Sequence, residues 1–113
     1  MQAYVDGLNR GDAEAVIALF AADAVIEDPV GTGPKRGQAI RDWFQQAVAM
    51  KAQLVLATPI RGSHGHSAAM AFTVTTEWEG RRASIRSLDV CTFDEAGRIT
   101  RLEGYWGSDD VET

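Results

Sequence analysis

The sequence is poor in cysteine and in positive charge, and it has no long apolar run. A single cysteine among 113 residues, Cys91, excludes an internal disulfide and is typical of a reducing compartment. With 11 Lys and Arg against 16 Asp and Glu, the formal charge of -5 argues against binding to nucleic acid. No apolar stretch reaches membrane-spanning length, and the start of the chain lacks the segments of a signal peptide. We therefore expect a cytoplasmic protein that neither inserts into a membrane nor binds nucleic acid.

Metal-ligating residues are scarce as well. The two histidines, His64 and His66, lie in a Gly- and Ser-rich run at residues 62–67 that is typical of a loop. A metal site built on this pair would need a third ligand, which the neighbouring sequence does not offer, so solvated loop histidines are the simpler interpretation. The chain also has no phosphate-binding glycine motif and no nucleophile elbow. The sequence thus predicts no metal and no organic cofactor.

The first half of the chain reads as helices around one short strand. At 45% hydrophobic and 24% charged residues, the composition predicts a single domain over residues 1–113. Residues 1–20 predict helix with a break at residues 9–11, after which Asp12 can cap a second helix. Residues 24–27 predict a strand that stops at Pro29, and residues 31–37 predict a loop. Residues 38–50 predict an amphipathic helix, whose apolar face is Ile40, Trp43, Phe44, Ala47 and Val48.

From residue 54 onward the apolar pattern changes to a period of two. It predicts strands over residues 54–60, 70–78, 81–93 and 99–106, with hairpins at residues 79–80 and 94–97. Helices first and strands later are typical of an α+β fold, here a strongly curved antiparallel sheet with helices packed on one face. Such a cone-shaped arrangement can enclose a pocket for an apolar ligand.

Asp89 is the clearest anomaly in this pattern. It shares a strand face with Ile85, Cys91 and Phe93, although aspartate is a poor strand former. If that face is the core, the pKa of the carboxyl group should rise and the group should stay protonated, so that it can donate a hydrogen bond. The alternative is an Asp89 that faces solvent or pairs with an arginine.

Two further residues are candidates on weaker grounds. Asp28 follows the strand at residues 24–27 and faces the glycine-rich loop, a setting suited to a general base and equally to an ordinary turn aspartate before proline. Tyr4 lies beside Val5 and Leu8 in the first helix, so an inward ring would bring its hydroxyl group into the core.

Together these segments resemble Δ5-3-ketosteroid isomerase. The similarity runs over nearly the whole chain and rests on three stretches: AYVDGLNRGDAEAVIALFAADAVIEDPVG at residues 3–31, AFTV at residues 71–74 and LDVCTFDEAGRI at residues 88–99. The resemblance implies a nuclear-transport-factor-2-like fold, a homodimer, and a reaction that needs no cofactor because the ketone of the substrate delocalises charge.

The resemblance also implies a role for each candidate residue. The general base of the family falls on Asp28, its oxyanion-hole donors fall on Tyr4 and a protonated Asp89, and substrate-binding wall positions fall on Phe44, Phe72 and Trp106. The family reaction moves a C=C bond of a 3-oxo-Δ5-steroid into conjugation through a dienolate. This family is itself a standard example of two carboxyl groups with opposed protonation in one site, so these roles come from the resemblance.

Two departures from the family pattern affect Tyr4. Phe44 stands where many members have a tyrosine that donates a hydrogen bond to the oxyanion tyrosine, which we expect to reduce activity modestly. Only three residues precede Tyr4, and helix ends fray, so we expect Tyr4 to be held less firmly.

Other readings of the sequence stay open. Another cone-fold enzyme, of the polyketide cyclase or epoxide hydrolase type, would also use pocket carboxylates, but an epoxide hydrolase of this type needs an Asp-Arg-Asp set and Arg86 lies on the strand face opposite to Asp89. A non-catalytic, ligand-binding dimer module is the other alternative. Leu88 and Val90, on the outer face of their strand, are candidates for a homodimer contact.

Overall fold

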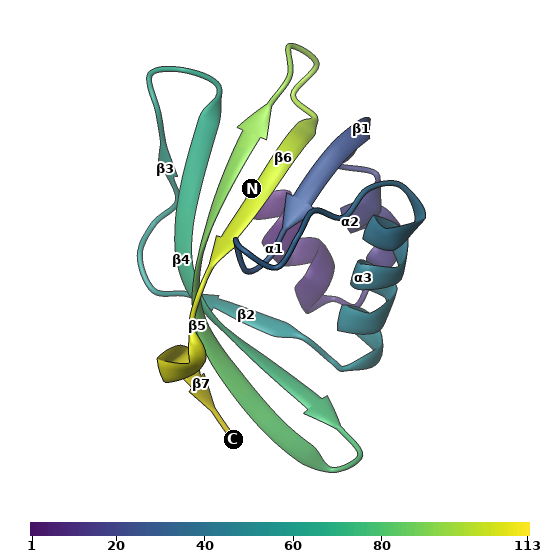
Figure 1. Ribbon diagram of the computed structural model, residues 1–113, viewed down its shortest axis with the longest axis vertical. Helices are drawn as coiled ribbons and strands as arrows, with labels where there is room; N and C mark the ends of the chain where they lie inside the picture. Colours follow the sequence, from purple (N-terminus) through teal and green to yellow (C-terminus); the bar gives the residue numbers. More distant parts are fainter.

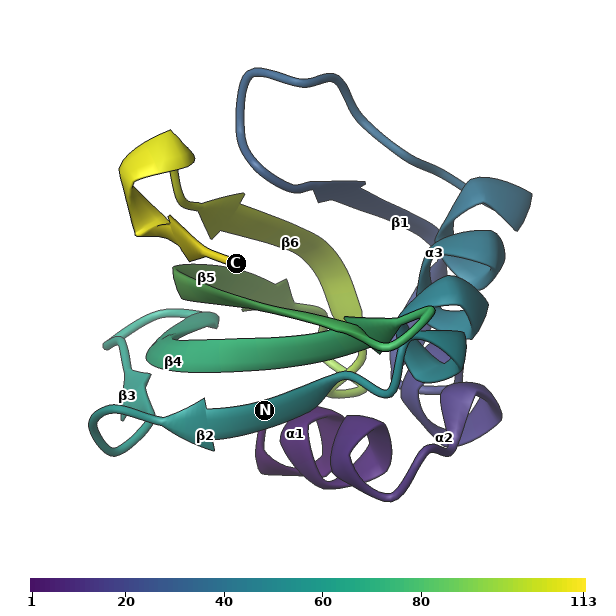
Figure 2. The ribbon, with the colours of Figure 1, turned by 90° about the horizontal axis from the view of Figure 1, so that it is seen from below.

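The computed structural model describes all 113 residues as a curved sheet with three helices on one of its faces (Figure 1). The strand order is β1-β6-β5-β4-β2, and the two shortest strands, β3 and β7, pair with β4 and β5. Figure 2 shows the strands from β1 to β2 following an arc, with the helices gathered at one side of it. The elements are α1 (Gln2–Asn9), α2 (Ala13–Ile17), β1 (Phe20–Glu27), α3 (Gln38–Ala49), β2 (Gln53–Leu56), β3 (Arg61–Gly62), β4 (Ser67–Trp78), β5 (Arg81–Phe93), β6 (Ile99–Tyr105), a 3-10 helix η1 (Ser108–Asp110) and β7 (Val111–Glu112).

Local sequence signals confirm several of the predicted boundaries. Asp12 caps α2, since its side chain accepts a hydrogen bond of 3.0 Å from the backbone N–H of Ala15. Between β4 and β5, Glu79 and Gly80 have φ angles of 52° and 77°, as a two-residue turn between twisted strands requires. The strand predicted over residues 81–93 is β5 with those bounds.

The first strand differs from its prediction. Phe20, predicted as the end of a helix, is the first residue of β1 and is buried in the core. The carbonyl group of Leu19 accepts a hydrogen bond of 2.8 Å from the backbone N–H of Ile99, and β1 then pairs in parallel with β6. Sheet pairing with a distant segment therefore overrides the helical spacing, and the sheet is mixed rather than wholly antiparallel.

The second strand is shorter than predicted. β2 ends at Leu56, and Ile60 lies in the connection to β3. Pro59 in this connection has no N–H group to donate to a ladder, which explains why pairing does not continue.

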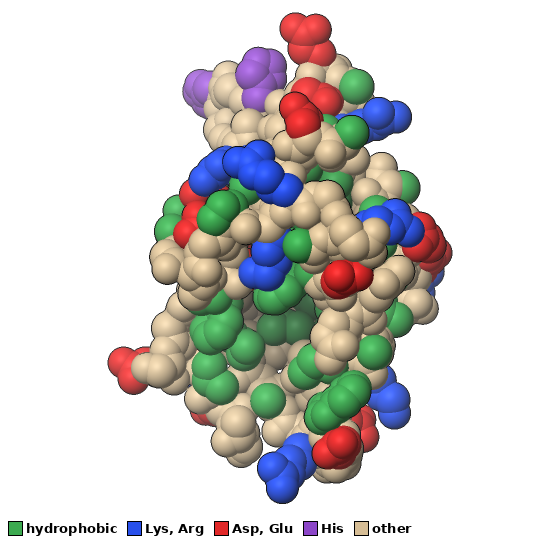
Figure 3. All heavy atoms as spheres, turned by 45° about the vertical axis from the view of Figure 1, so that its right-hand side comes forward, with side chains coloured by type: hydrophobic (Ala, Val, Ile, Leu, Met, Phe, Trp, Pro, Cys, Tyr) green, Lys and Arg blue, Asp and Glu red, His purple; other side chains and the backbone are tan.

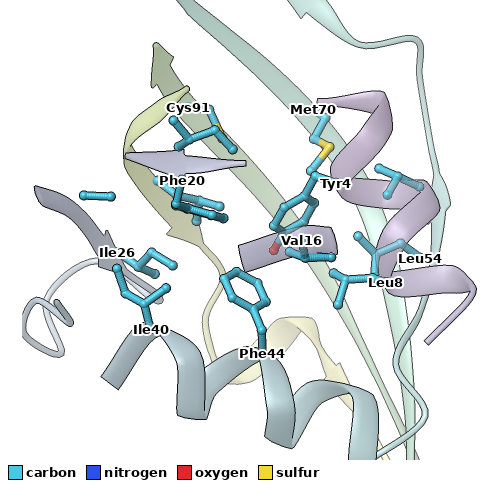
Figure 4. Close-up of a cluster of buried hydrophobic side chains, with 14 of the residues drawn as sticks. Tyr4, Leu8, Val16, Phe20, Ile26, Ile40, Phe44, Leu54, Met70 and Cys91 are labelled. Carbon is cyan, nitrogen blue, oxygen red and sulfur yellow. The ribbon is translucent and has the colours of Figure 1, made fainter. Parts of the chain in front are cut away.

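One apolar cluster joins the sheet to the helices. α1 contributes Tyr4, Val5 and Leu8, and α3 contributes Ile40 and Phe44 from the face predicted to be apolar. Figure 4 shows these side chains converging from both helices toward the sheet. The α+β fold with a curved sheet is confirmed, and the concave face is where the candidate site lies.

Candidate active site

A cavity of about 230 Å³ lies between the concave face of the sheet and the helices. Figure 3 shows this hollow with apolar side chains in its depth. Its wall carries three ionisable side chains, and all six residues predicted for the site line it: Tyr4, Asp28, Phe44, Phe72, Asp89 and Trp106. The fold thus brings together residues that are up to about a hundred positions apart in the sequence.

Asp89 faces inward from β5, as the strand alternation predicted. It is 1% exposed, and its Oδ1 atom has no hydrogen-bond partner in the protein. Burial raises the pKa of this carboxyl group well above its ordinary value, the charge of Asp28 raises it further, and the Ser87 hydroxyl group opposes the rise. Asp89 is therefore a neutral acid whose hydrogen-bonding capacity is unused by the protein.

Tyr4 reaches the cavity from α1. Its ring is 6% exposed and packs edge-on against Phe44 and Phe20, with ring centroids 5.7 Å and 6.5 Å away. Although we expected a position close to a helix end to be frayed, the ring lies inside the core, and Figure 4 shows its hydroxyl group directed toward Phe44. Burial raises the pKa of Tyr4 well above 10.0, and the charges of Asp89 and Asp28 add to this rise. The hydroxyl group therefore keeps its proton and can donate it to a ligand.

Asp28 stands just beyond the end of β1 and has a specific partner. The indole Nε1–H of Trp106 donates a hydrogen bond of 2.8 Å to its Oδ1 atom. Burial raises the pKa of Asp28, whereas this hydrogen bond and the charge of Lys35 lower it. Trp106, predicted as an apolar wall, therefore also contacts the candidate base through its polar edge.

Gly104 is a site residue that our sequence reasoning missed. It lies opposite Asp89 in the β5–β6 ladder, and a Cβ atom added to it would overlap the Asp28 carboxyl group. Its carbonyl group also accepts a hydrogen bond of 2.9 Å from Val30 N–H, which fixes the chain just after Asp28. A glycine inside a predicted strand is the signal that could have found it, because such a residue often marks a close approach of another group.

The remaining candidates lie away from the cavity. No arginine or lysine lines it, and Arg86 instead donates a hydrogen bond of 2.9 Å to the carbonyl group of Asp109 on the outer side of β5. His64 and His66 are exposed in the loop between β3 and β4, and the chain holds no group of three metal-ligating side chains. Cys91 is a buried free thiol, as predicted, and burial raises its pKa to about 12. None of the helices is long and apolar enough to cross a membrane.

Two characterised proteins are similar to this chain over nearly its whole length. The steroid Delta-isomerase of Nocardioides simplex is 36% identical over 108 residues, which are 96% of this chain and 87% of the relative. The epoxide hydrolase LasB of Streptomyces lasalocidi is 31% identical over 112 residues, which are 95% of this chain and 40% of the relative.

Solved structures match the fold closely. The epoxide hydrolase/cyclase-like enzyme SalBIII, studied for pyran ring formation in the polyether salinomycin, gives a TM-score of 0.90 at 29% identity, over 97% of this chain and 89% of SalBIII. RV0760c from Mycobacterium tuberculosis, solved in complex with estradiol-17beta-hemisuccinate, gives a TM-score of 0.91 at 24% identity, over 99% of this chain and 94% of that protein.

A family model described as the SnoaL-like domain matches residues 1–102. The match agrees with the observed cone of curved sheet and helices, and the resemblance to steroid isomerases is confirmed at the level of the family. The chain therefore belongs to the SnoaL-like domain family and has a nuclear-transport-factor-2-like fold.

Proposed function

We propose that this protein is a steroid Δ-isomerase, which moves a C=C bond of a 3-oxo-Δ5-steroid into conjugation with the ketone. The observation that carries the proposal is the set of ionisable groups in the cavity, which consists of one carboxyl group with a hydrogen-bonding partner and two buried acids that keep their protons. The steroid Delta-isomerase of Nocardioides simplex, at 36% identity, supports the same assignment.

The first step is removal of a proton by Asp28. Its carboxylate takes the proton from the carbon next to the 3-keto group, and the electron pair of that C–H bond moves through the ketone to give a dienolate. Burial makes Asp28 a stronger base than an exposed carboxylate, and the Trp106 N–H group fixes the direction in which one of its oxygen atoms faces.

The second element is stabilisation of the charge that develops on the ketone oxygen. Tyr4 O–H and the protonated carboxyl group of Asp89 both line the cavity, and neither has its hydrogen-bonding capacity satisfied elsewhere in the protein. Two donors in a water-poor cavity stabilise an oxyanion far better than they would in water.

The third step returns the proton. Protonated Asp28 delivers it two carbon atoms along the dienolate, which completes the conjugated enone and regenerates the carboxylate. No atom or electron is gained or lost overall, so the reaction needs no co-reactant. Phe44, Phe72 and Trp106 supply apolar wall that favours a fused-ring hydrocarbon over water.

The decisive experiment follows the conjugated-enone absorbance after a 3-oxo-Δ5-steroid is added. The wild type should produce the enone, and Asp28→Asn should abolish its formation because an amide cannot take the proton. Asp23→Asn is the matched control, since it makes the same change at an exposed position of β1. Full activity in Asp28→Asn, or tight steroid binding by the wild type with no turnover, would refute the proposal.

A second candidate is epoxide opening. It is favoured by the similarity to LasB and to SalBIII, and two carboxyl groups of opposed protonation suit an acid–base pair for that reaction as well. The lack of any arginine on the cavity wall counts against the Asp-Arg-Asp type of epoxide hydrolase. Release of a diol or cyclic ether from an epoxide substrate, without any enone from steroids, would favour this second function.

We also propose a homodimer formed through the outer face of the sheet. Leu88 and Tyr105 are cross-strand partners on β5 and β6 and are 42% and 47% exposed, which is unusual for such large side chains on neighbouring strands. Leu88→Glu should convert a dimer to a monomer in sedimentation velocity at micromolar concentration, whereas Val30→Glu, in the loop after β1, should not. A monomeric wild type under these conditions would overturn this proposal.

A further inference from the structure

Lys35 lies where the loop after β1 passes over the cavity wall. Its Nζ atom is 4.4 Å from the centroid of the Trp43 ring, a distance typical of a cation–π contact. Trp43 belongs to α3 and lines the cavity. The ammonium group is therefore held against an aromatic wall of the site rather than free in solvent.

The backbone of Lys35 is tied down as well. Its N–H group donates a hydrogen bond of 2.7 Å to the carbonyl group of Ile26, and its own carbonyl group accepts one of 3.0 Å from Ile26 N–H. Ile26 lies two residues before Asp28 on the same strand. This bridge closes the loop between them, so that Lys35 and Asp28 lie at the same end of β1.

The charges around Asp28 make Lys35 distinctive. Tyr4 from α1 and Asp89 from β5 share the cavity with Asp28, and both keep their protons. Among the neighbouring carboxylates, Glu27 accepts backbone N–H groups of Gly31 and Gly33, and Glu103 on β6 pairs with Arg101. Lys35 is the cation whose charge lowers the pKa of Asp28, against the larger effect of burial.

We propose that Lys35 is a positioning residue of the active site, held by Trp43 and by the bridge to Ile26 so that its ammonium group keeps the Asp28 carboxyl group in its charged form. The inference deepens the proposed isomerase function and rests on it for the catalytic meaning of that charge. An apolar cavity favours the neutral form of a carboxyl group, and a neutral Asp28 cannot remove a proton from the substrate. A fixed positive charge nearby counteracts this effect of burial.

The test is the dependence of kcat/KM on pH for Lys35→Met. Without the ammonium group, the pKa of Asp28 should rise, so the acid limb of the profile should move to higher pH. Roughly three- to tenfold lower kcat/KM is expected at about pH 5, with an equal or slightly higher value at about pH 8, where the stronger base is fully ionised. A merely structural role would lower activity equally at both pH values.

Three further variants complete the experiment. Lys35→Arg keeps the charge and should restore the wild-type profile, whereas Trp43→Leu, which removes the aromatic support, should move the acid limb in the same direction as Lys35→Met. Arg36→Met removes the same charge one residue along the loop, at an exposed position, and should leave the profile unchanged. An acid limb that stays in place in Lys35→Met, or moves equally in Arg36→Met, would overturn the proposal.

Titration of Asp28 in the free protein separates this inference from the proposed function. The carboxyl ¹³C resonance of Asp28, followed by NMR without substrate, should have a higher midpoint in Lys35→Met than in the wild type. This measurement decides the role of Lys35 even if no steroid is isomerised, an outcome that would refute the isomerase proposal alone. Identical midpoints in the two proteins would refute the role of Lys35 alone.

Discussion

The indole N–H group of Trp106 donates a hydrogen bond of 2.8 Å to Asp28, although the two residues are 78 positions apart in the sequence. Trp106 follows β6 and Asp28 follows β1, and these strands pair in parallel, so their carboxyl ends meet at one edge of the sheet. The contact gives the carboxyl group a fixed orientation at the cavity wall, where a carboxylate that rotates freely would be a poorer base.

Trp106→Phe should shift the acid limb of the kcat/KM profile to higher pH. Loss of the N–H donor removes an interaction that lowers the pKa of Asp28, and a roughly tenfold loss of kcat/KM below neutral pH is expected from one hydrogen bond to a charged group. Trp78→Phe, at an exposed position of β4, is the control and should behave as the wild type. An unchanged acid limb in Trp106→Phe would show that the hydrogen bond does not influence the base.

Gly104→Ala should impair catalysis more than folding. The new Cβ atom would overlap the Asp28 carboxyl group, which must then move away from its position beside Trp106. Displacement of a catalytic group by about 1 Å can cost on the order of a hundredfold in rate, so we expect kcat to fall about ten- to a hundredfold. Gly107→Ala is a matched control, because a Cβ atom there meets no atom within 4 Å. Equal rates for both variants would contradict the expected crowding at Asp28.

Asp89→Asn should flatten the dependence of stability on pH. The pKa of Asp89 is raised in the folded protein, so the folded state binds this proton more tightly than the unfolded state does. The free energy of unfolding of the wild type should therefore fall as the pH rises from the ordinary range of aspartate through the raised pKa. Urea unfolding at a series of pH values measures this slope. The same slope in wild type and Asp89→Asn would mean that Asp89 is not the group responsible.

Phe44→Tyr should increase turnover by a few fold. Phe44 lies edge-on to Tyr4, whose hydroxyl group is directed toward it, so an added hydroxyl group can donate a hydrogen bond to Tyr4. Such a bond is worth about 1 kcal/mol in proteins and would strengthen Tyr4 as an oxyanion donor. Steady-state kinetics and the far-UV circular dichroism spectrum are the readouts. Lower turnover with an unchanged spectrum would contradict the view that Phe44 limits activity.

Features encoded by neighbouring residues were predictable from the sequence alone. The cap at Asp12, the turn at Glu79 and Gly80, and the bounds of β5 each depend on residues within a few positions of one another. The inward orientation of Asp89 follows from the same local logic, because side chains alternate along a strand. The resemblance to steroid isomerases then joined Tyr4, Asp28 and Asp89 into one expected site.

Contacts between distant segments were decided only by the tertiary structure. The parallel pairing of β1 with β6 recruited Phe20 into a strand and brought Trp106 and Gly104 against Asp28. The contact of Lys35 with Trp43 likewise joins a loop to a helix. No periodicity or turn signal encodes such pairs, since they arise where the chain packs against itself. The sequence therefore determined which chemical groups the protein has, and packing decided which of them face one another and how strongly each holds its proton.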